Sequence, residues 1–442
     1  MKANQILINV FQKLMGDNRP RLLKELNETF LYDFKKLSEW QFNKVKYLLD
    51  YSYKHVPFYK TWFDLHGVNV HEVKDFADYA SKIPVLTKSD ILKNIDSFSN
   101  LGPEKGAKII HQSTGGSTGQ TLRFKMSQVD HETGTALLLR GMGHAGYTLG
   151  DRLLVLAGGS LVSGKTSIKS KLVNKLFGQY RISSYGLQES DFEKIADLII
   201  SEQIKYLRGY ASALYLFADY CKSVNREIFL NAVFSTSEIL LDNQRLLIEA
   251  TFGCRVFNQY GLNDGGVSAF QFTDDDSLVI DMERGYMEIN QQQAPEDHNS
   301  KAGAILATSF LNFEFPFIRY DTGDIGEISS QYIGSFPDRP RLIKLLGRET
   351  EFLQLNGKKV ASPVLTVLMG KTNAEQYTIV QKGPSLVQVS IKKGVGYNKG
   401  DEIFIRKSLF EHCGEFDLDF QYVEKFSNKN KHKFIIREWN PL

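Results

Sequence analysis

The chain has 442 residues, of which 42% are hydrophobic and 24% are charged. That length exceeds one ordinary core and predicts two unequal domains, and the composition excludes an intrinsically disordered chain. Lysine and arginine together number 54 and aspartate and glutamate 51, which leaves a formal net charge of only +3. Because nucleic-acid binders carry a basic excess, we expect no nucleic acid among its partners.

The cysteines and the hydropathy pattern exclude further classes. Cys221, Cys254 and Cys413 lie far apart without the spacing of metal ligands, so we expect neither a zinc site nor a disulfide framework. No apolar run approaches the roughly 20 residues that a membrane span needs, and the N-terminus lacks the apolar core and cleavage site of a secretory signal. We therefore expect a cytoplasmic protein without a transmembrane segment.

Helical periodicity dominates the first hundred residues. In the stretch 37–56, LSEWQFNKVKYLLDYSYKHV, apolar residues recur every three or four positions, which predicts a helix that ends before Pro57. The stretch 75–94, DFADYASKIPVLTKSDILKN, predicts a short helix, a break at its proline and a second helix capped by Ser or Asp. The N-terminal region is therefore expected to be helical.

From about residue 108 the pattern changes to alternating strands and helices. Buried strands are expected at 152–158 and 302–310, and the amphipathic stretch 189–204 predicts a helix. Residues 285–290 and 323–330 have the more polar character of exposed antiparallel strands. This alternation predicts an α/β fold with a substantially buried sheet.

The C-terminal region has strand and helix signals of its own. Strands are expected at 385–393 and 433–439, and they flank a helical stretch at 401–414. We place a domain boundary near Arg348–Gln354. The expected fold is α/β, with a large multi-subdomain N-terminal domain of layered sheets and helices and a small, mobile C-terminal α+β domain. The two domains would span residues 1–347 and residues 348–442.

The segment 111–124, HQSTGGSTGQTLRF, combines glycines with hydroxyl side chains. Glycine permits close approach of the backbone, and hydroxyls together with backbone N–H groups form a concavity that binds phosphate. The Gly-Lys element of a Walker loop is absent. The alternative is an ordinary Gly/Ser-rich hairpin loop. The candidate phosphate-binding residues are Ser113, Thr114, Gly115, Gly116, Ser117, Thr118 and Gly119.

Two further segments offer groups that suit a nucleotide. FNQYGLNDGG (257–266) contains Tyr260 and Asp264; the aromatic ring would suit stacking on adenine and the carboxylate would suit Mg²⁺. The alternative for Tyr260 is simple packing within a turn. RYDTGDIG (319–326) presents Asp324, whose carboxylate would accept both ribose hydroxyls, although an ordinary Asp-Gly turn has the same sequence.

Two basic segments complete the set. LGRET (346–350) adds Arg348, whose planar guanidinium suits ribose or phosphate oxygens. NKNKHKFIIRE (428–438) presents lysines directly before the last expected strand. Taken alone, this lysine cluster would be a solvated basic loop.

The order of these segments, more than any one of them, resembles the adenylate-forming superfamily. The series STGGSTGQ, YGLNDGG, RYDTGD, LGRE and NKHKF follows the order of that family's motifs. The stretches VPFYK, IPVLTKSDI, GDR, RGYAS and TSE are similar to its phenylacetate–CoA ligase-like branch, including relatives from polysaccharide gene clusters. The similarity covers roughly residues 40–440.

The resemblance implies a role for each motif residue. The hydroxyl and glycine loop would bind the β- and γ-phosphates of ATP, and a lysine of the C-terminal domain would reach the α-phosphate and the substrate carboxylate. The implied nucleotide-site residues are the loop 113–119 at the phosphates, Tyr260 and Gly261 at the adenine, Asp264 at Mg²⁺, and Asp324 and Arg348 at the ribose.

The sequence departs from the family pattern at three places. Asp264 stands where the family usually has glutamate, and Thr350 stands at the expected domain hinge. Asn430 replaces a common glycine, which leaves the choice of catalytic lysine open among its neighbours. The run KHKFII favours Lys431 over Lys429 and Lys433.

The resemblance implies ATP-dependent activation of a small carboxylic acid to its acyl-AMP, with Mg²⁺ as cofactor and coenzyme A as the acceptor of the acyl group. Alternatives are direct transfer to an amine or sugar in surface-polysaccharide biosynthesis, and a non-catalytic nucleotide-binding homologue. The resemblance also allows a homodimer. Residues expected to line the acid pocket are His144, Tyr147 and Tyr210, although His144 is equally well explained as a structural histidine.

Overall fold

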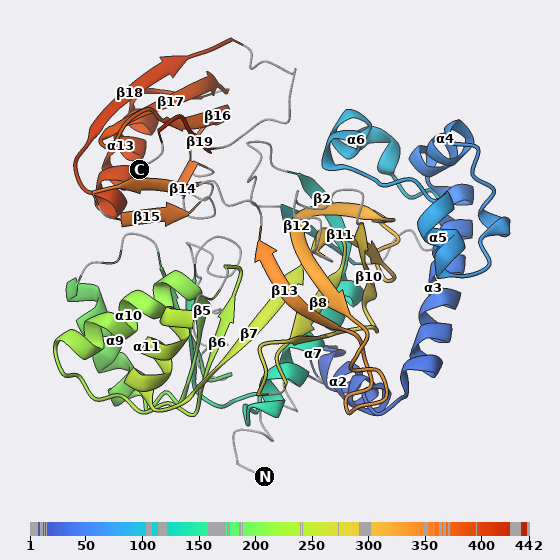
Figure 1. The fold of residues 1–442 in the computed structure, drawn as a ribbon, viewed down its shortest axis with the longest axis horizontal. Helices are drawn as coiled ribbons and strands as arrows, with labels where there is room; N and C mark the ends of the chain where they lie inside the picture. The colour runs from blue at the N-terminus through green and yellow to red at the C-terminus, as the bar shows by residue number, and fades with distance from the viewer. Residues whose placement is uncertain are drawn as a thin grey trace.

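A computed structural model gives the fold of the chain (Figure 1). It describes residues 8, 12, 14, 16–102, 108–113, 122–157, 174, 177–184, 187, 189–238, 240, 242–272, 274–290, 302–347, 352–356, 358–361, 365, 368, 369, 372–394, 396–424 and 435–439.

The N-terminal region is helical, as predicted. The apolar residues of its longest helix face a core that also contains aromatic residues of the following helices. The helix predicted near residue 90 begins with a capping box between Thr87 and Asp90, so threonine, rather than Ser or Asp, caps it. The elements are α2 (Arg19–Thr29), α3 (Phe34–His55), α4 (Pro57–Leu65), η1 (Val70–Glu72), α5 (Phe76–Lys82), α6 (Lys88–Lys93) and η2 (Ile95–Phe98).

An 11-stranded mixed sheet forms the centre of the molecule, in the order β10-β11-β12-β13-β9-β8-β7-β6-β5-β3-β4. One half is parallel: β4 (Gln179–Ser183), β3 (Leu153–Ala157), β5 (Tyr206–Tyr210), β6 (Ala232–Thr236) and β7 (Arg255–Leu262). The other half is antiparallel: β8 (Val267–Phe270), β9 (Leu278–Ile280), β13 (Arg341–Gly347), β12 (Tyr320–Ser329), β11 (Gly303–Ser309) and β10 (Gly285–Asn290).

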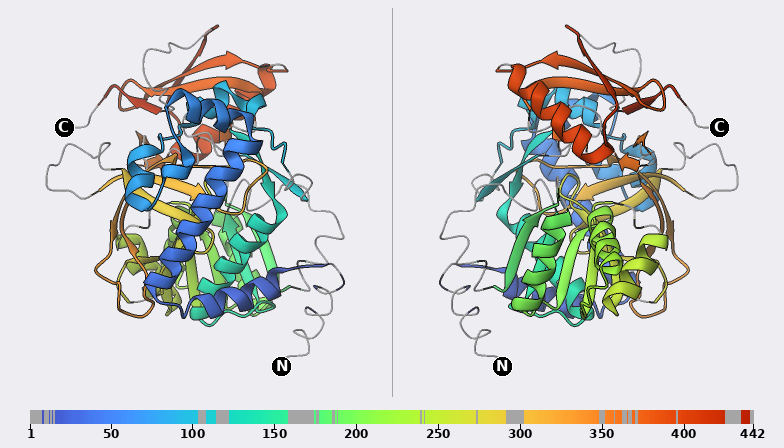
Figure 2. Two further views of the ribbon diagram at one scale, coloured as in Figure 1. Left: turned by 90° about the vertical axis from the view of Figure 1, so that its right-hand side faces the viewer. Right: turned by 90° about the vertical axis from the view of Figure 1, so that its left-hand side faces the viewer.

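Helices cover both faces of the parallel half (Figures 1 and 2). On one face, α9 (Glu189–Ser201), α10 (Ala211–Ser223) and α11 (Asp242–Phe252) pack on alternate strand residues such as Leu207 and Val233. On the other face, α7 (Gln128–His144) covers the intervening residues, such as Val155 and Phe234. This two-sided burial explains why β3 and β6 are mostly apolar and fully buried.

A hairpin of β1 (Ile109–Ser113) and β2 (Arg123–Ser127) precedes α7. The C-terminal region contains a second sheet, in the order β18 (Asp417–Tyr422), β17 (Leu386–Lys393), β16 (Ala374–Gln381) and β19 (Ile435–Arg437). It also contains the helix α13 (Lys399–Cys413) and a hairpin of β14 (Phe352–Leu355) and β15 (Lys358–Ala361). Among the described residues, its core is formed by residues from 353 onward. Figure 1 shows this region beyond the carboxyl ends of the parallel strands. None of the helices that the structure describes is long and apolar enough to cross a membrane.

Candidate nucleotide and acid site

Two residues that lie 64 positions apart in the chain meet in the structure. Tyr260, near the end of β7, donates a hydrogen bond from its hydroxyl group to Oδ2 of Asp324 in β12, at 3.0 Å. Both residues are buried, with 6% and 8% exposure. The adenine and ribose candidates of the sequence therefore lie in direct contact.

The turn between β7 and β8 brings the metal candidate to the same place. Asp264 accepts a hydrogen bond from the hydroxyl group of Tyr320, the first residue of β12, at 3.4 Å. The turn then passes so close to β11 that a Cβ atom on Gly266 would lie 2.5 Å from Oγ of Ser309. Glycine is required there, and its φ of +63° also favours glycine.

The DTGD segment is part of strand β12, where the pairing with β11 shifts register at a bulge. The backbone N–H of Asp324 donates to Oγ1 of Thr322, and that hydroxyl donates to the carbonyl oxygen of Ile305 on β11. Gly347, the residue before Arg348, pairs with Ile325, the residue after Asp324. Arg348 itself lies outside the described residues, as does Thr350.

Arg284, which the sequence did not single out, binds the turn between β7 and β8 through hydrogen bonds. Arg284 donates from Nε to Asp130 at the start of α7, at 2.8 Å, and its other nitrogens reach the carbonyl oxygen of Leu262 and Oδ1 of Asn263. The side chains of Arg284 and Asp130 are 4% and 0% exposed. Because the two partners are 154 residues apart, no local pattern indicates the pair.

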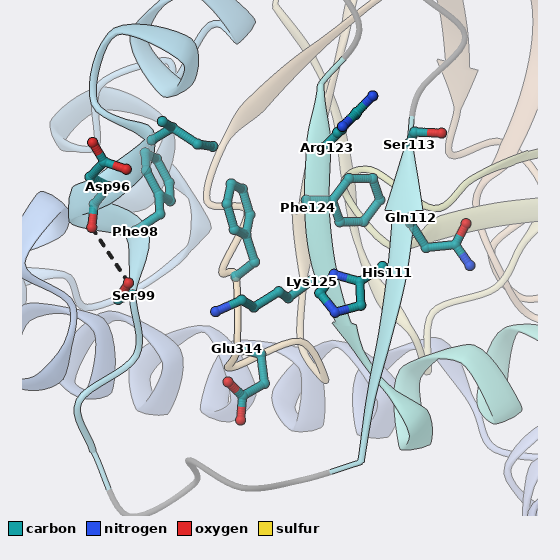
Figure 3. Close-up of a pocket in the computed structure, with 12 residues that line it drawn as sticks. Asp96, Phe98, Ser99, His111, Gln112, Ser113, Arg123, Phe124, Lys125 and Glu314 are labelled. Atoms are coloured by element: carbon teal, nitrogen blue, oxygen red, sulfur yellow. Dashed lines mark hydrogen bonds between the residues drawn. The ribbon is translucent and has the colours of Figure 1, made fainter.

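The phosphate-loop candidate begins at the β1–β2 hairpin. Ser113 ends β1 opposite Arg123, and His111 lies opposite Lys125. All four residues line a cavity of about 630 Å³ beside Glu314, and Figure 3 shows them on the two strands of the hairpin. The remaining loop residues, Thr114, Gly115, Gly116, Ser117, Thr118 and Gly119, lie outside the described residues.

Proteins similar to this chain were found by sequence and by structure. Protein CapK of Staphylococcus aureus is 26% identical over 372 residues, which cover 80% of this chain and 79% of CapK. Phenylacetate-coenzyme A ligase of Escherichia coli is 24% identical and that of Pseudomonas putida is 24% identical, covering 74% and 83% of this chain and 74% and 82% of those proteins. No family model matches the chain.

A crystal structure of 2-hydroxyisobutyryl-CoA ligase in complex with 2-HIB-AMP and CoA has the same fold, with a TM-score of 0.62, 15% identity and coverage of 92% of this chain and 91% of that one. Together these similarities support a place in the adenylate-forming superfamily. The relatives support the phenylacetate–CoA ligase-like branch and the class of adenylate-forming acid ligases. The predicted family, enzyme class and α/β fold are thus confirmed.

Within this adenylate-forming fold, the three acid-pocket candidates do not lie together. Tyr210 ends β5 at the carboxyl edge of the parallel strands. His144 ends α7, which runs back to the opposite edge, and its ring packs against Phe30 and Phe272. Tyr147 lies at that opposite edge too, where the hydroxyl group of Tyr206, the first residue of β5, donates to the carbonyl oxygen of Gly146.

The donor set fits a magnesium ion that arrives with phosphate. Asp264 is a single carboxylate, and within the described residues no group of three or more His, Cys, Asp or Glu side chains forms a metal site. Mg²⁺ usually binds one or two carboxylates together with water and substrate phosphates, so a lone buried carboxylate beside the nucleotide candidates is compatible with it. The lysine candidates Lys429, Lys431 and Lys433 lie outside the described residues, directly before β19.

Proposed function

We propose that the chain activates a small carboxylic acid with ATP, forming an acyl-AMP and pyrophosphate, and then transfers the acyl group to coenzyme A. The observation that carries this proposal is the contact between Tyr260 and Asp324, with Asp264 in the turn directly after β7. The relatives named phenylacetate-coenzyme A ligase support the same reaction type.

The buried contact supports a proposed role for each partner. Asp324 would accept the ribose hydroxyls, because an ionised carboxylate is an acceptor only and can take two hydrogen bonds. The hydroxyl group of Tyr260 orients that carboxylate before the nucleotide binds. Since Tyr260 is only 6% exposed, adenine would contact the exposed edge of its ring. Gly261 and Arg348 would complete the nucleoside site.

The phosphate end of the site would be formed by residues 113–119 and Asp264. Bound Mg²⁺ would neutralise phosphate charge there, held by Asp264 and the phosphates. The basic residues Arg123 and Lys125 lie on the strand opposite Ser113 and His111 and would raise the positive potential at the entrance to the loop.

The chemical step requires two anions to meet. An oxygen of the substrate carboxylate attacks the α-phosphorus of ATP, the bond to the bridging oxygen breaks, and pyrophosphate leaves. No general base is needed, because the carboxylate is already ionised at neutral pH. A cation between the reactants offsets their repulsion, and we assign this role to Lys431 of the C-terminal domain, residues 348–442.

Two alanine variants test the assignment. Lys431→Ala should reduce acid-dependent ATP–pyrophosphate exchange by about 100-fold or more while ATP still binds, and the same change at Lys429 and Lys433 should have little effect. Full exchange in Lys431→Ala would overturn the choice of lysine.

Asp324→Ala should weaken ATP binding by roughly 10- to 100-fold in calorimetry. Asp219→Ala, which removes an exposed aspartate, should leave ATP binding unchanged. Unchanged affinity in Asp324→Ala would remove the ribose role.

Product analysis decides the acceptor. An acyl-CoA formed only when coenzyme A is added supports the proposed second step. An amide or ester formed with an amine or sugar would replace it by the polysaccharide alternative. ATP binding without exchange over a broad panel of acids would instead identify a non-catalytic homologue.

A further inference from the structure

The register of the parallel strands places a row of polar side chains at the carboxyl edge of the sheet. Tyr210 of β5 pairs with Thr236 of β6, and Thr236 pairs with Gln259 of β7. Gln259 directly precedes Tyr260, which contacts Asp324. In open α/β sheets ligands bind at the carboxyl ends of the strands, so this row is a candidate floor for the substrate acid.

Arg208 lies two residues before Tyr210 in β5, on the same face of the sheet. Side chains alternate along a strand, so Arg208 and Tyr210 of β5 point to the face that α7 covers, about 7 Å apart along the strand. Nη2 of Arg208 donates to Oε1 of Gln259 at 3.1 Å, which joins it to the row. Its Nε atom is shielded from solvent and has no hydrogen-bond partner among the described residues.

A second arginine adds charge to this face instead of neutralising it. Arg181 of β4 and Arg208 of β5 both pair with Val155 of β3, one from each side, so their side chains lie on the same face. No carboxylate pairs with Arg208 in the part of the chain that the structure describes. Burial and the nearby charge of Arg181 lower the pKa of Arg208 to about 10, so it remains positively charged at neutral pH.

Arg208 is partly buried and has no anionic partner among the described residues; such an arrangement is costly, and proteins normally pair such groups. The cost is explained if a ligand supplies the anion. The reacting carboxylate of the substrate cannot be that anion, because it must meet ATP at the edge of the sheet, beyond Tyr210. A group that reaches Arg208 must therefore be a second one, carried deeper on the same molecule.

We propose that the acid which this enzyme activates carries a second anionic group, a carboxylate or a phosphate, and that Arg208 binds this group with Arg181 nearby. The inference depends on the proposed function for its reaction, but the anion site has a readout of its own. It excludes simple aryl and aliphatic monoacids as the preferred substrates. Arg208 is then the residue that determines specificity.

The first experiment compares acids matched in size by ATP–pyrophosphate exchange: succinate with butyrate, glutarate with valerate, phthalate with benzoate and phosphoglycolate with glycolate. We expect the dianionic member of one or more pairs to have a kcat/KM about 100-fold higher. Arg208→Met should abolish that preference, mainly through KM, because a bound charge loses its partner. The phosphoglycolate pair distinguishes phosphate from carboxylate recognition.

A matched variant controls for the loss of an arginine. Arg226→Met removes an exposed arginine that pairs with Asp197 on the other face of the sheet, and it should keep the wild-type preference. Arg208→Lys retains the charge but loses the planar fork, so it should prefer dianions with affinity about 10-fold lower. Equal use of both members of every pair, or a preference for the monoacid, would overturn the inference while the proposed function stands.

Thermal stabilisation by the same acids without ATP separates the two proposals. If exchange fails with every acid but a dianionic acid raises the melting temperature of the wild type and not of Arg208→Met, the anion site stands and the adenylation proposal falls. If neither exchange nor stabilisation depends on Arg208, the anion site is rejected.

Discussion

Arginines with a solvent-shielded Nε atom occur at two places in the α/β core that differ in what surrounds them. At the end of the molecule where α2 crosses α7, Arg140 and Arg339 are completely buried and paired with acids. In the middle of β5 of the parallel sheet, Arg208 is partly buried beside a glutamine and a second arginine. The first place contains its own counter-charges, whereas the second does not.

The paired cluster is closed by short contacts. Glu283 accepts from Arg140 at 2.8 Å and from Arg339 at 2.9 Å, and Asp281 accepts from Arg140 at 2.7 Å. The ring of Phe30, at the end of α2, lies 4.7 Å and 5.0 Å from the two guanidinium carbons. These contacts join α2, α7 and the segment before β10 into one unit, so the cluster has a structural explanation that needs no ligand.

The difference shows how buried charge distinguishes structure from function in this fold. A charge that finds its partner within the chain stabilises the fold or fixes its geometry. A charge whose partner is absent from the described chain indicates a ligand. This contrast predicts opposite responses to substitution at the two places.

The largest effect is expected at Glu283. Glu283→Gln leaves Arg339 without a charged partner. The side chains of Arg339 and Glu283 are 0% and 5% exposed, and breaking a buried pair in this way costs about 3–5 kcal/mol of folding stability. Chemical denaturation measures the loss. Glu25→Gln, in an exposed pair with Arg21, should cost less than about 1 kcal/mol. Equal losses in the two variants would contradict the structural role of the cluster.

Acid should weaken the same cluster. Burial alone would raise the pKa of Glu283, but Arg140 and Arg339 hold it well below its usual range. A carboxyl group with a lowered folded-state pKa contributes stability that is complete above its unfolded pKa of about 4.3 and is lost as the pH falls below it. The difference in melting temperature between wild type and Glu283→Gln should therefore be constant above about pH 5 and shrink in more acidic buffer.

This pH comparison needs the glutamine variant as its reference. Burial raises the pKa of the neighbouring Asp281, so that group titrates with the opposite sign in the wild type. A stability difference that grew as the pH fell would show that Glu283 is not ionised in the folded protein.

Local patterns in the sequence were sufficient for most of the fold. The periodicity at 37–56 and 189–204 gave α3 and α9, because a packed helix face repeats every 3.6 residues. The order of motifs predicted that Tyr260 and Asp324 share a site, and the structure brings these two into contact. The strands at 285–290 and 302–310 were likewise recognisable from residue type.

Long-range contacts were not predictable in this way. Arg284 and Asp130 pair across 154 residues, so neither has a local signal. Arg208 lies within the quoted stretch RGYAS, but its importance depends on the register of β3, β4, β5 and β7, which a single strand does not contain. His144 was placed by motif order, and the direction of α7 carries it to the opposite edge of the sheet.

A smaller effect is expected at Tyr260, whose hydroxyl group donates to Asp324, the carboxylate that we propose binds the ribose. Tyr260→Phe removes the hydrogen bond that orients the Asp324 carboxylate. A hydrogen bond to a charged group is worth about 1.5–3 kcal/mol. ATP affinity in calorimetry should fall by about 10-fold, less than for Asp324→Ala. Tyr397→Phe, in the C-terminal sheet region, is the matched control and should leave affinity unchanged.

The smallest change in stability is expected at Arg208, and its sign matters more than its size. If Arg208 served the fold, Arg208→Met would lower the melting temperature, as Glu283→Gln does. Because the side chain is partly buried and lacks an acidic partner in the described chain, replacing it with an apolar side chain of similar length should leave the ligand-free protein equally stable or slightly more stable. Thermal unfolding without ligand measures this directly. A clear loss of stability would place Arg208 with the structural arginines and remove the contrast between the two ends of the fold.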